Sequence, residues 1–404
     1  MRLSNRTPWD APSNRLTRAR QARDTAGLPT IDLTRSNPTT AGLSYPLEEL
    51  SAILGRSARA SYSPDSRGLL SARQAIAAEL SKRGSDVSPD DLILTASTSE
   101  AYSFLFKLLC NPGDSVLVPV PSYPLLEHLA ALESVAIRTF PLTFHSKAEN
   151  SRWALESHIL EEALDPTTSK AIVAIHPNNP TGSYLGTDEL NMLESLCAGR
   201  AMPLISDEVF FDYPILDVSR RSAASLRNNL SFSLGGLSKS AGLPHWKLGW
   251  IQLSGPEPLR RTAVEGLELI ADTFLSVSSP VQVAVPELLA LARDLRASIS
   301  ARTRTNLNSL RDRLRDVSLI ELLPVEGGWS AVLRLPSIRT DEELALALLE
   351  RQGVLIQPGY FFDFPQEGFV VLSLLGDGHE LAEGVARIIA LVEELCSSGA
   401  HEHG

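Results

Sequence analysis

Cysteine, basic charge and long apolar runs are all scarce in this sequence. Its three cysteines, Cys110, Cys197 and Cys396, are odd in number and widely spaced, which fits neither a disulfide framework nor a zinc site. The formal net charge of −11 argues against non-specific binding to nucleic acid, which requires a basic surface. No apolar run approaches the roughly 18–20 residues that span a bilayer, and the first residues lead into no apolar signal core. We therefore expect a cytoplasmic protein with no metal, nucleic-acid partner or membrane partner.

The length of 404 residues suits one large domain plus a smaller one. A hydrophobic content of 43% and a charged content of 21% are ordinary for a globular protein. We predict an N-terminal arm with part of the small domain over residues 1–45, a large domain over 46–285 and a small C-terminal domain over 286–404. The first 30 or so residues are rich in Arg, Ser, Asn and Pro, and we expect them to be extended or loosely helical.

Apolar segments without polar alternation occur between longer amphipathic segments in the first two thirds of the chain. This pattern predicts a mostly parallel sheet covered by helices on both faces, an α/β architecture. We expect helices at residues 69–82, 100–109, 125–132 and 187–196, and buried strands at 92–94, 116–118, 171–175 and 203–205.

The pattern changes beyond about residue 285. Helices and strands there are segregated, which predicts a smaller α+β domain. We expect a long charged helix at 289–315, a half-exposed strand at 330–335, a helix at 341–351, strands at 354–356 and 369–374, and a final helix to about residue 395.

Three motifs each follow or end an apolar segment predicted to be a strand. They are His-Pro-Asn-Asn-Pro-Thr-Gly at 176–182, Ser-Asp-Glu-Val-Phe at 206–210 and Gly-Gly-Leu-Ser-Lys at 235–239. In open α/β sheets, ligands bind at the carboxyl ends of the strands. We therefore expect the three motifs to meet at one edge of the sheet.

Each motif carries one side chain with a distinct chemical use. Alone, Lys239 would be a surface lysine, Asp207 a strand cap or an arginine partner, and Asn179 part of an ordinary turn. Together they supply an amine whose pKa burial depresses, so that it can form a Schiff base. They also supply a carboxylate that needs a positive partner and an amide for a ring hydroxyl. These are the requirements of pyridoxal phosphate.

With these motifs, the sequence resembles the class I/II aminotransferases, pyridoxal phosphate enzymes of fold type I, over nearly its whole length. Further matching segments follow in the same order, at residues 62–68, 97–100, 121–124, 278–282 and 357–359 with Phe362. The resemblance implies an aspartate-aminotransferase-like fold, in which the large domain binds the cofactor.

The resemblance also implies a role for each site residue. Lys239 forms the Schiff base and moves the substrate proton, Asp207 keeps the ring nitrogen protonated, and Asn179 binds the ring hydroxyl. Tyr123 stacks on the ring. The phosphate is held at a helix N-terminus and by nearby side chains, with one tyrosine contributed across a homodimer: Ser97, Thr98, Ser99, Ser238, Lys247 and Tyr62.

Three cofactor-side positions depart from the family pattern. Phe210 replaces a tyrosine three residues after the aspartate, which is expected to raise the pKa of the Schiff base because a hydroxyl donor is lost. Lys247 replaces an arginine, so the charge stays but the bidentate fork is lost. Gly236 stands where a serine is common.

The fourth departure concerns the substrate. Val371, in Phe-Val-Val-Leu-Ser at 369–373, occupies the place of the arginine that clamps the substrate carboxylate. Arg35 is the candidate substitute, or else an exposed arginine of the arm, and Ser36 beside it replaces a common glycine. Arg334 is a weaker candidate, because we expect it to point away from the site. The sequence does not identify the substrate.

The resemblance predicts ping-pong transfer of an amino group between an amino donor and an oxo-acid acceptor. A lyase, racemase or decarboxylase acting on a specialised substrate is the alternative, because the same cofactor serves all of these reactions and Val371 removes the usual carboxylate clamp. A non-catalytic sensor is a third hypothesis. Sensors of that kind carry a DNA-binding domain, and we expect the stretch before Ile31 to be too short for one.

Overall fold

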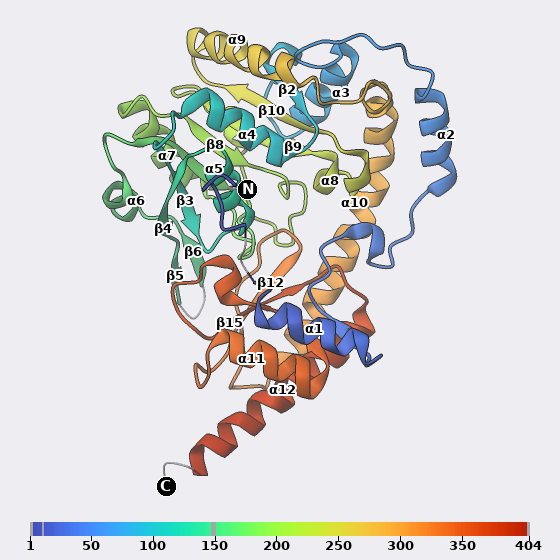
Figure 1. Ribbon diagram of the computed structural model, residues 1–404, viewed down its shortest axis with the longest axis vertical. Helices are drawn as coiled ribbons and strands as arrows, with labels where there is room; N and C mark the ends of the chain where they lie inside the picture. Colours follow the sequence, from blue (N-terminus) through green and yellow to red (C-terminus); the bar gives the residue numbers. More distant parts are fainter. Residues whose placement is uncertain (1–2, 10–11, 147–150, 402–404) are drawn as a thin grey trace.

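The computed structural model describes residues 3–9, 12–146 and 151–401, which form two sheet-based parts that share one long helix (Figure 1). The larger part is built on a seven-stranded sheet and the smaller part on a four-stranded sheet. Helix α10 (Ser279–Leu314) runs along both parts, and α12 (Gly378–His401) covers the smaller one.

The seven-stranded sheet is parallel except for one strand. Its order is β2-β10-β9-β8-β7-β3-β4, and only β10 runs antiparallel to its neighbours. Strands β2, β3, β9 and β10 are buried along their whole length, and β2 and β3 are almost entirely apolar, as strands covered on both faces are expected to be. The strands are β2 (Leu92–Thr95), β3 (Ser115–Val120), β4 (Ala136–Pro141), β7 (Ser169–Ile175), β8 (Leu204–Asp207), β9 (Ser231–Gly236) and β10 (Gly249–Ser254).

Helices cover both faces of this sheet, because alternate strand residues point to opposite sides. Val116 and Val173 pack in a core with α4, α5 and α9, whereas Leu117 and Ile172 pack on the other side with α6 and α7. The helices of this part are α2 (Leu47–Ser57), α3 (Leu70–Ser81), α4 (Thr98–Leu109), α5 (Leu125–Leu132), α6 (Ser157–Ala163), α7 (Thr187–Gly199), α8 (Leu237–Ser240) and α9 (Glu257–Phe274); a short pair, β5 (Thr143–His145) with β6 (Arg152–Ala154), lies beside them.

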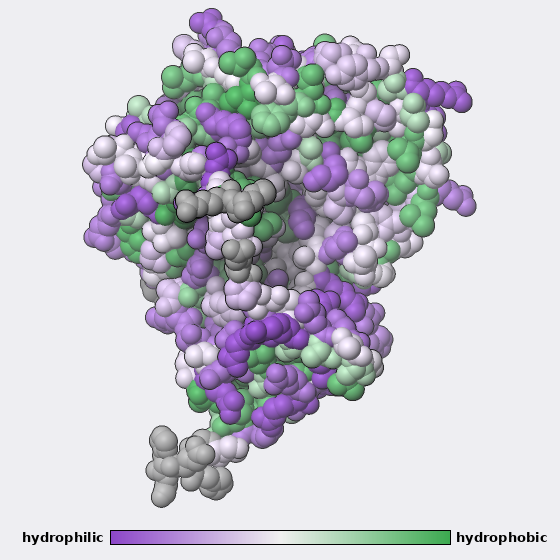
Figure 2. Space-filling view, in the orientation of Figure 1, coloured by the Kyte–Doolittle hydropathy of each residue, from purple (hydrophilic) through white to green (hydrophobic). Residues whose placement is uncertain are grey.

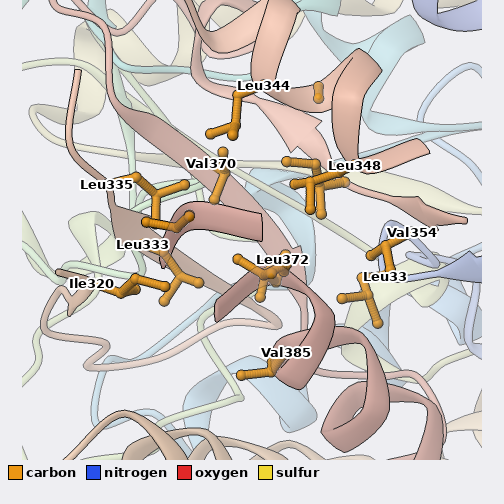
Figure 3. Packing of buried hydrophobic residues seen from close by; sticks show 14 of the residues in the cluster. Leu33, Ile320, Leu333, Leu335, Leu344, Leu348, Val354, Val370, Leu372 and Val385 are labelled. Carbon is orange, nitrogen blue, oxygen red and sulfur yellow. The ribbon is translucent and has the colours of Figure 1, made fainter. Parts of the chain in front are cut away.

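The smaller part has an antiparallel sheet in the order β11-β12-β15-β14. Its core includes Leu333, Val370, Leu372 and Val385, and Leu33 from the N-terminal segment joins them (Figure 3). The elements are β11 (Glu321–Leu322), β12 (Ser330–Arg334), β14 (Gln357–Pro358), β15 (Phe369–Ser373), the parallel pair β1 (Ile31–Asp32) and β13 (Val354–Leu355), α1 (Arg15–Thr25), and α11 (Asp341–Ala347) followed by a π-helical turn, Leu348–Gln352.

Three local expectations differ from the structure. The first 30 residues contain a regular helix, α1, because Asn14 caps its first turn (Oδ1 accepts from the Thr17 amide at 2.7 Å) and Leu16 is buried. Helix α10 begins ten residues earlier than expected and contains Pro286. Strand β12 is buried rather than half-exposed, because Ala331 and Val332 pack into separate cores on its two faces. The predicted domain limits stay a prediction, and α10 crosses the one at residue 285.

The part of the chain that the structure describes shows neither a candidate membrane-spanning helix nor a candidate metal site. Within it, no helix has the length and apolar character needed to cross a bilayer. Nor do three or more His, Cys, Asp or Glu side chains of these residues gather where they could hold a metal ion. Cys110, Cys197 and Cys396 are free thiols, and Cys197 is buried.

Replacing Ile172, which is fully buried in the interior strand β7, tests the hydrophobic core between the seven-stranded sheet and helices α6 and α7. We expect Ile172→Ala to lower the free energy of unfolding by about 2–5 kcal/mol, because it removes apolar contacts and leaves a cavity. The matched control is Ile338→Ala, at an exposed loop position, with an expected change of about 0.5 kcal/mol or less. Urea unfolding measures both, and equal losses would contradict the assignment of the core.

Candidate active site

A cavity of about 230 Å³ lies between the two parts of the molecule, at the carboxyl ends of β7, β8 and β9. Figure 2 shows a hollow between the two parts on the face in view. Because these strands are parallel neighbours, residues that follow them meet at one edge. Nine residues singled out from the sequence line the cavity: Ser36, Ser97, Thr98, Ser99, Tyr123, Asn179, Asp207, Ser238 and Lys239.

Lys239 projects its amine into an aromatic environment. Its Nζ lies 5.0 Å from the ring centroid of Trp329 and 5.5 Å from that of Phe210, and it donates to the Ser36 carbonyl at 3.4 Å. Burial lowers the pKa of Lys239 to about 8, although the negative charge of Asp207 opposes that shift. About a tenth of the amine is therefore neutral, and nucleophilic, at pH 7, far more than for an ordinary lysine.

Asp207, the last residue of β8, is a buried carboxylate with little compensation. Its Oδ2 accepts a hydrogen bond from the Tyr102 hydroxyl at 3.1 Å, and its Oδ1 accepts one from the Val209 amide at 3.1 Å. Burial raises the pKa of Asp207 to about 6, with these bonds and the charge of Lys239 acting in the opposite direction. Within the described residues it forms no salt bridge, so a positive group that bound beside it would be stabilised.

The N-terminus of α4 provides backbone N–H groups as hydrogen-bond donors at a second wall of the cavity. The Ser97 hydroxyl accepts from the Glu100 amide at 3.2 Å, and the Glu100 carboxylate accepts from the Ala96 amide at 2.7 Å. This cap uses the Ser97 side chain but leaves the first-turn amides of Thr98 and Ser99 without an intrahelical acceptor. Such amides, together with the helix dipole, favour an anion.

The turn that carries Asn179 is fixed by its neighbours. Asn178 Oδ1 accepts from the Thr181 hydroxyl at 2.9 Å. Gly182 has φ +73°, and a Cβ there would lie 2.5 Å from the Gly327 carbonyl oxygen. The Gly327 amide also donates to the Gly182 carbonyl at 2.9 Å. Only glycine fits this close approach, which holds the turn against the smaller part and leaves the Asn179 amide facing the cavity.

Tyr102 and Trp329 are two of the site residues that were not predicted from the sequence. Tyr102 lies one helical turn after Thr98 on α4, so the helical period could have placed it on the same face. Trp329 packs edge-on against Phe210 and Tyr213, with ring centroids 5.1 and 5.0 Å apart. It reaches the cavity from the smaller part, and no local sequence signal indicates that placement.

Three predicted residues do not line the cavity. Lys247 is exposed, in a left-handed conformation (φ 48°) just before β10. Tyr62 is 74% exposed and lies near the start of α10. Arg35 is turned toward Glu380, with Nη1 and Oε2 3.0 Å apart. The roles predicted for all three stay predictions.

The substrate side has no arginine in the described part of the cavity lining. Val371 is 1% exposed and packs with Phe362 and Phe369. Arg334 is exposed and paired with Glu321, and it does not line the cavity.

The pKa of Lys239 can be measured in the cofactor-free protein. We expect an apparent pKa near 8 by competitive amine labelling with mass spectrometry, with the exposed Lys247 as an internal comparison. Asp207→Asn should lower the Lys239 pKa further, because a negative charge that stabilises the ammonium form is removed. A Lys239 pKa that rises or stays constant in this variant would contradict the electrostatic coupling.

Solved structures share this fold. An alanine aminotransferase from Pyrococcus furiosus superposes with a TM-score of 0.87 at 24% identity, covering 97% of this chain and 100% of that one. A double mutant of the aspartate aminotransferase of Thermus thermophilus superposes with a TM-score of 0.83 at 21% identity, covering 96% and 100%. These likenesses confirm the expected aspartate-aminotransferase-like fold.

Two bacterial aminotransferases are similar to this chain in sequence over most of its length. The chain is 26% identical over 343 residues to the glutamate-pyruvate aminotransferase AlaA of Escherichia coli K12, covering 83% of each. It is 28% identical over 369 residues to an alanine aminotransferase of Mycobacterium tuberculosis, covering 89% of this chain and 84% of the relative. Residues 30–388 match the family described as aminotransferase class I and II. The chain belongs to this family and is an aminotransferase.

Proposed function

We propose that this aminotransferase works with pyridoxal phosphate and that Lys239 is its catalytic amine. The supporting observation is the placement of a half-buried amine, Lys239, and a half-buried carboxylate, Asp207, in one cavity at the carboxyl edge of the sheet, with no salt bridge to Asp207 among the described residues. A family of transferases that carry amino groups requires both an attachment point and an electron sink.

The residues of the cavity fit the cofactor. Asp207 would face the protonated ring nitrogen, Asn179 the ring hydroxyl and Tyr123 the face of the ring. The first turn of α4 and Ser238 would hold the phosphate, and Lys247, which lies outside the cavity lining, would add positive charge. When bound, the cofactor withdraws electrons from the bonds of the amino carbon, which makes its proton removable.

The chain's own residues then control the proton. Lys239 is the group that would hold the cofactor's aldehyde carbon and, when released, accept the proton of the amino carbon at Nζ. A pKa near 8 suits that role, because a general base is most effective when its pKa lies close to the working pH. The ring faces of Trp329 and Phe210 line the space around the amine and exclude water from it.

The names of the relatives suggest the first substrates to test. They include alanine and glutamate-pyruvate aminotransferases, so alanine and glutamate are the starting donors and pyruvate is the starting acceptor. Ammonia release without any oxo-acid acceptor would instead indicate the elimination chemistry of the alternative hypothesis.

We also propose a cytoplasmic homodimer. Large apolar side chains are exposed on α9, just after it and near the start of α10, where a monomer would leave them in water. They include Leu269, Phe274, Leu275 and Val283. In this arrangement Tyr62 of one subunit would reach the cofactor phosphate of the other.

Lys239→Ala tests the attachment point. In the wild-type protein, borohydride should fix the cofactor irreversibly to the peptide that contains Lys239, and peptide mass spectrometry should detect the adduct. In Lys239→Ala we expect no adduct and no transamination, because the only proposed attachment amine is gone.

Lys82→Ala, an exposed lysine paired with Glu79, is the control and should keep both signals. An adduct on another lysine of the wild-type protein, or transamination retained by Lys239→Ala, would refute the assignment.

Light scattering tests the dimer. We expect a mass of about twice 43.8 kDa. Leu269→Glu at the exposed position on α9 should shift the population toward the monomer, because it places a charge in the apolar contact. A wild-type monomer at micromolar concentration would contradict the proposal.

A further inference from the structure

The wall of the cavity contributed by the smaller part is neutral. It is made of aromatic rings and of uncharged polar side chains. Its members are Trp329, Ser330, Gln357, Phe361, Phe362 and Ser373. Lys239 is the only basic side chain in the described lining, and it belongs to the opposite wall.

Gln357 stands directly beside the position that lacks its arginine. In the antiparallel pairing of β14 with β15, Gln357 is the partner of Val371. Partners of this kind project to the same side of a sheet with their Cβ atoms roughly 4.5–5.5 Å apart. The Gln357 side chain lines the cavity, and it makes no hydrogen bond with any residue that the structure describes. A free amide therefore stands where the family pattern places a guanidinium.

Nearby cations are already engaged elsewhere. Arg35 is held by Glu380, and Arg334, at the end of β12, is held by Glu321 and does not line the cavity. A carboxylate that entered this wall would lose water without gaining a cation, and that loss is unfavourable.

The Gln357 amide suits a different ligand from the one that an arginine would bind. It carries two N–H donors and one carbonyl acceptor, so it can both give and receive a hydrogen bond. An uncharged carbonyl group satisfies it without the desolvation of a charge. The aromatic rings of Phe361 and Phe362 provide the apolar surface for a bulky side chain next to that group.

We propose that Gln357 binds an uncharged carbonyl group, an amide or an ester, attached to the amino carbon of the donor, and that this donor carries a large apolar side chain. The proposal rests on the proposed aminotransferase function and specifies its donor. The 2-oxo acid acceptor enters the same cavity in the second half-reaction. Because its carboxylate finds no cation at this wall, we expect a high KM for it, and the assay supplies it at high concentration.

The test compares three donors on the cofactor-loaded enzyme with pyruvate as acceptor: phenylalaninamide, phenylalanine methyl ester and free phenylalanine. We expect kcat/KM for the amide and the ester to exceed that for the acid by about tenfold or more, because only the acid places an unpaired charge at the wall. Use of the amide alone would show that the site requires an amide group. Equal use of the amide and the ester would show that the site binds any uncharged carbonyl group. Chromatography of the remaining donor checks that neither is hydrolysed to the acid.

Two substitutions at Gln357 locate the determinant. Gln357→Arg should reverse the preference toward free phenylalanine by about tenfold or more, since it supplies the missing cation. Gln357→Leu should raise KM for the amide about tenfold with little change in kcat, because only a hydrogen bond in the bound state is lost. Gln21→Arg adds the same charge at an exposed position on α1 and is the matched control.

The outcomes separate this proposal from the function on which it rests. Transamination of alanine or glutamate with an equal or better kcat/KM for free phenylalanine than for its amide would overturn the neutral-donor proposal and leave the aminotransferase function intact. An amide preference that neither variant changes would overturn the role of Gln357. No borohydride adduct on Lys239 and no turnover of any donor would refute the proposed function itself.

Discussion

The burial of the Asp207 carboxylate is the constraint around which the site is arranged. Parallel strands bring Asp207, Lys239 and the Asn179 turn to one edge, but a carboxylate placed there loses the water that would solvate it. Tyr102 and the Val209 amide compensate only in part, since the pKa of Asp207 remains raised to about 6. The cavity therefore favours positive charge at this point, which the protonated ring nitrogen of the proposed cofactor would supply.

The neighbouring carboxylate shows the contrast. Glu208 follows Asp207 directly, yet it accepts from the Ser222 hydroxyl at 2.7 Å and the Ala223 amide at 2.8 Å and pairs with Arg83 at 3.3 Å. Arg83 also binds Asp212, with Nη2 and Oδ2 2.9 Å apart. This network uses Glu208 entirely for structure and fixes the chain just after β8. Two consecutive acids thus have separate uses because one is saturated with partners and the other is not.

The sheet and most of the cavity were predictable because their signals are local. Continuous apolar runs predicted buried strands, and motifs placed after those strands predicted a shared edge. Trp329 was not predictable, because its position depends on how the smaller part docks on the larger one. The same holds for Arg35, whose pairing with Glu380 arises from contact between residues 345 positions apart. Helix α1 was underestimated, since its stability comes from a cap and one buried leucine rather than from an apolar stripe.

The contact between Gly182 and Gly327 has a mechanical consequence. The Gly328 amide also donates to the Tyr213 carbonyl at 2.9 Å, and the Tyr213 hydroxyl donates to the Lys239 carbonyl at 2.6 Å. The loop before Trp329 is thus anchored to the larger part, although it follows α10 in the chain. If the four-stranded sheet rotated, the rotation would be centred near this loop. Gln357 would then move across the cavity, whereas the Trp329 ring would stay beside Lys239. The part of the cavity wall that carries Gln357 would then move relative to the Trp329 indole, and the width of the cavity between them would change.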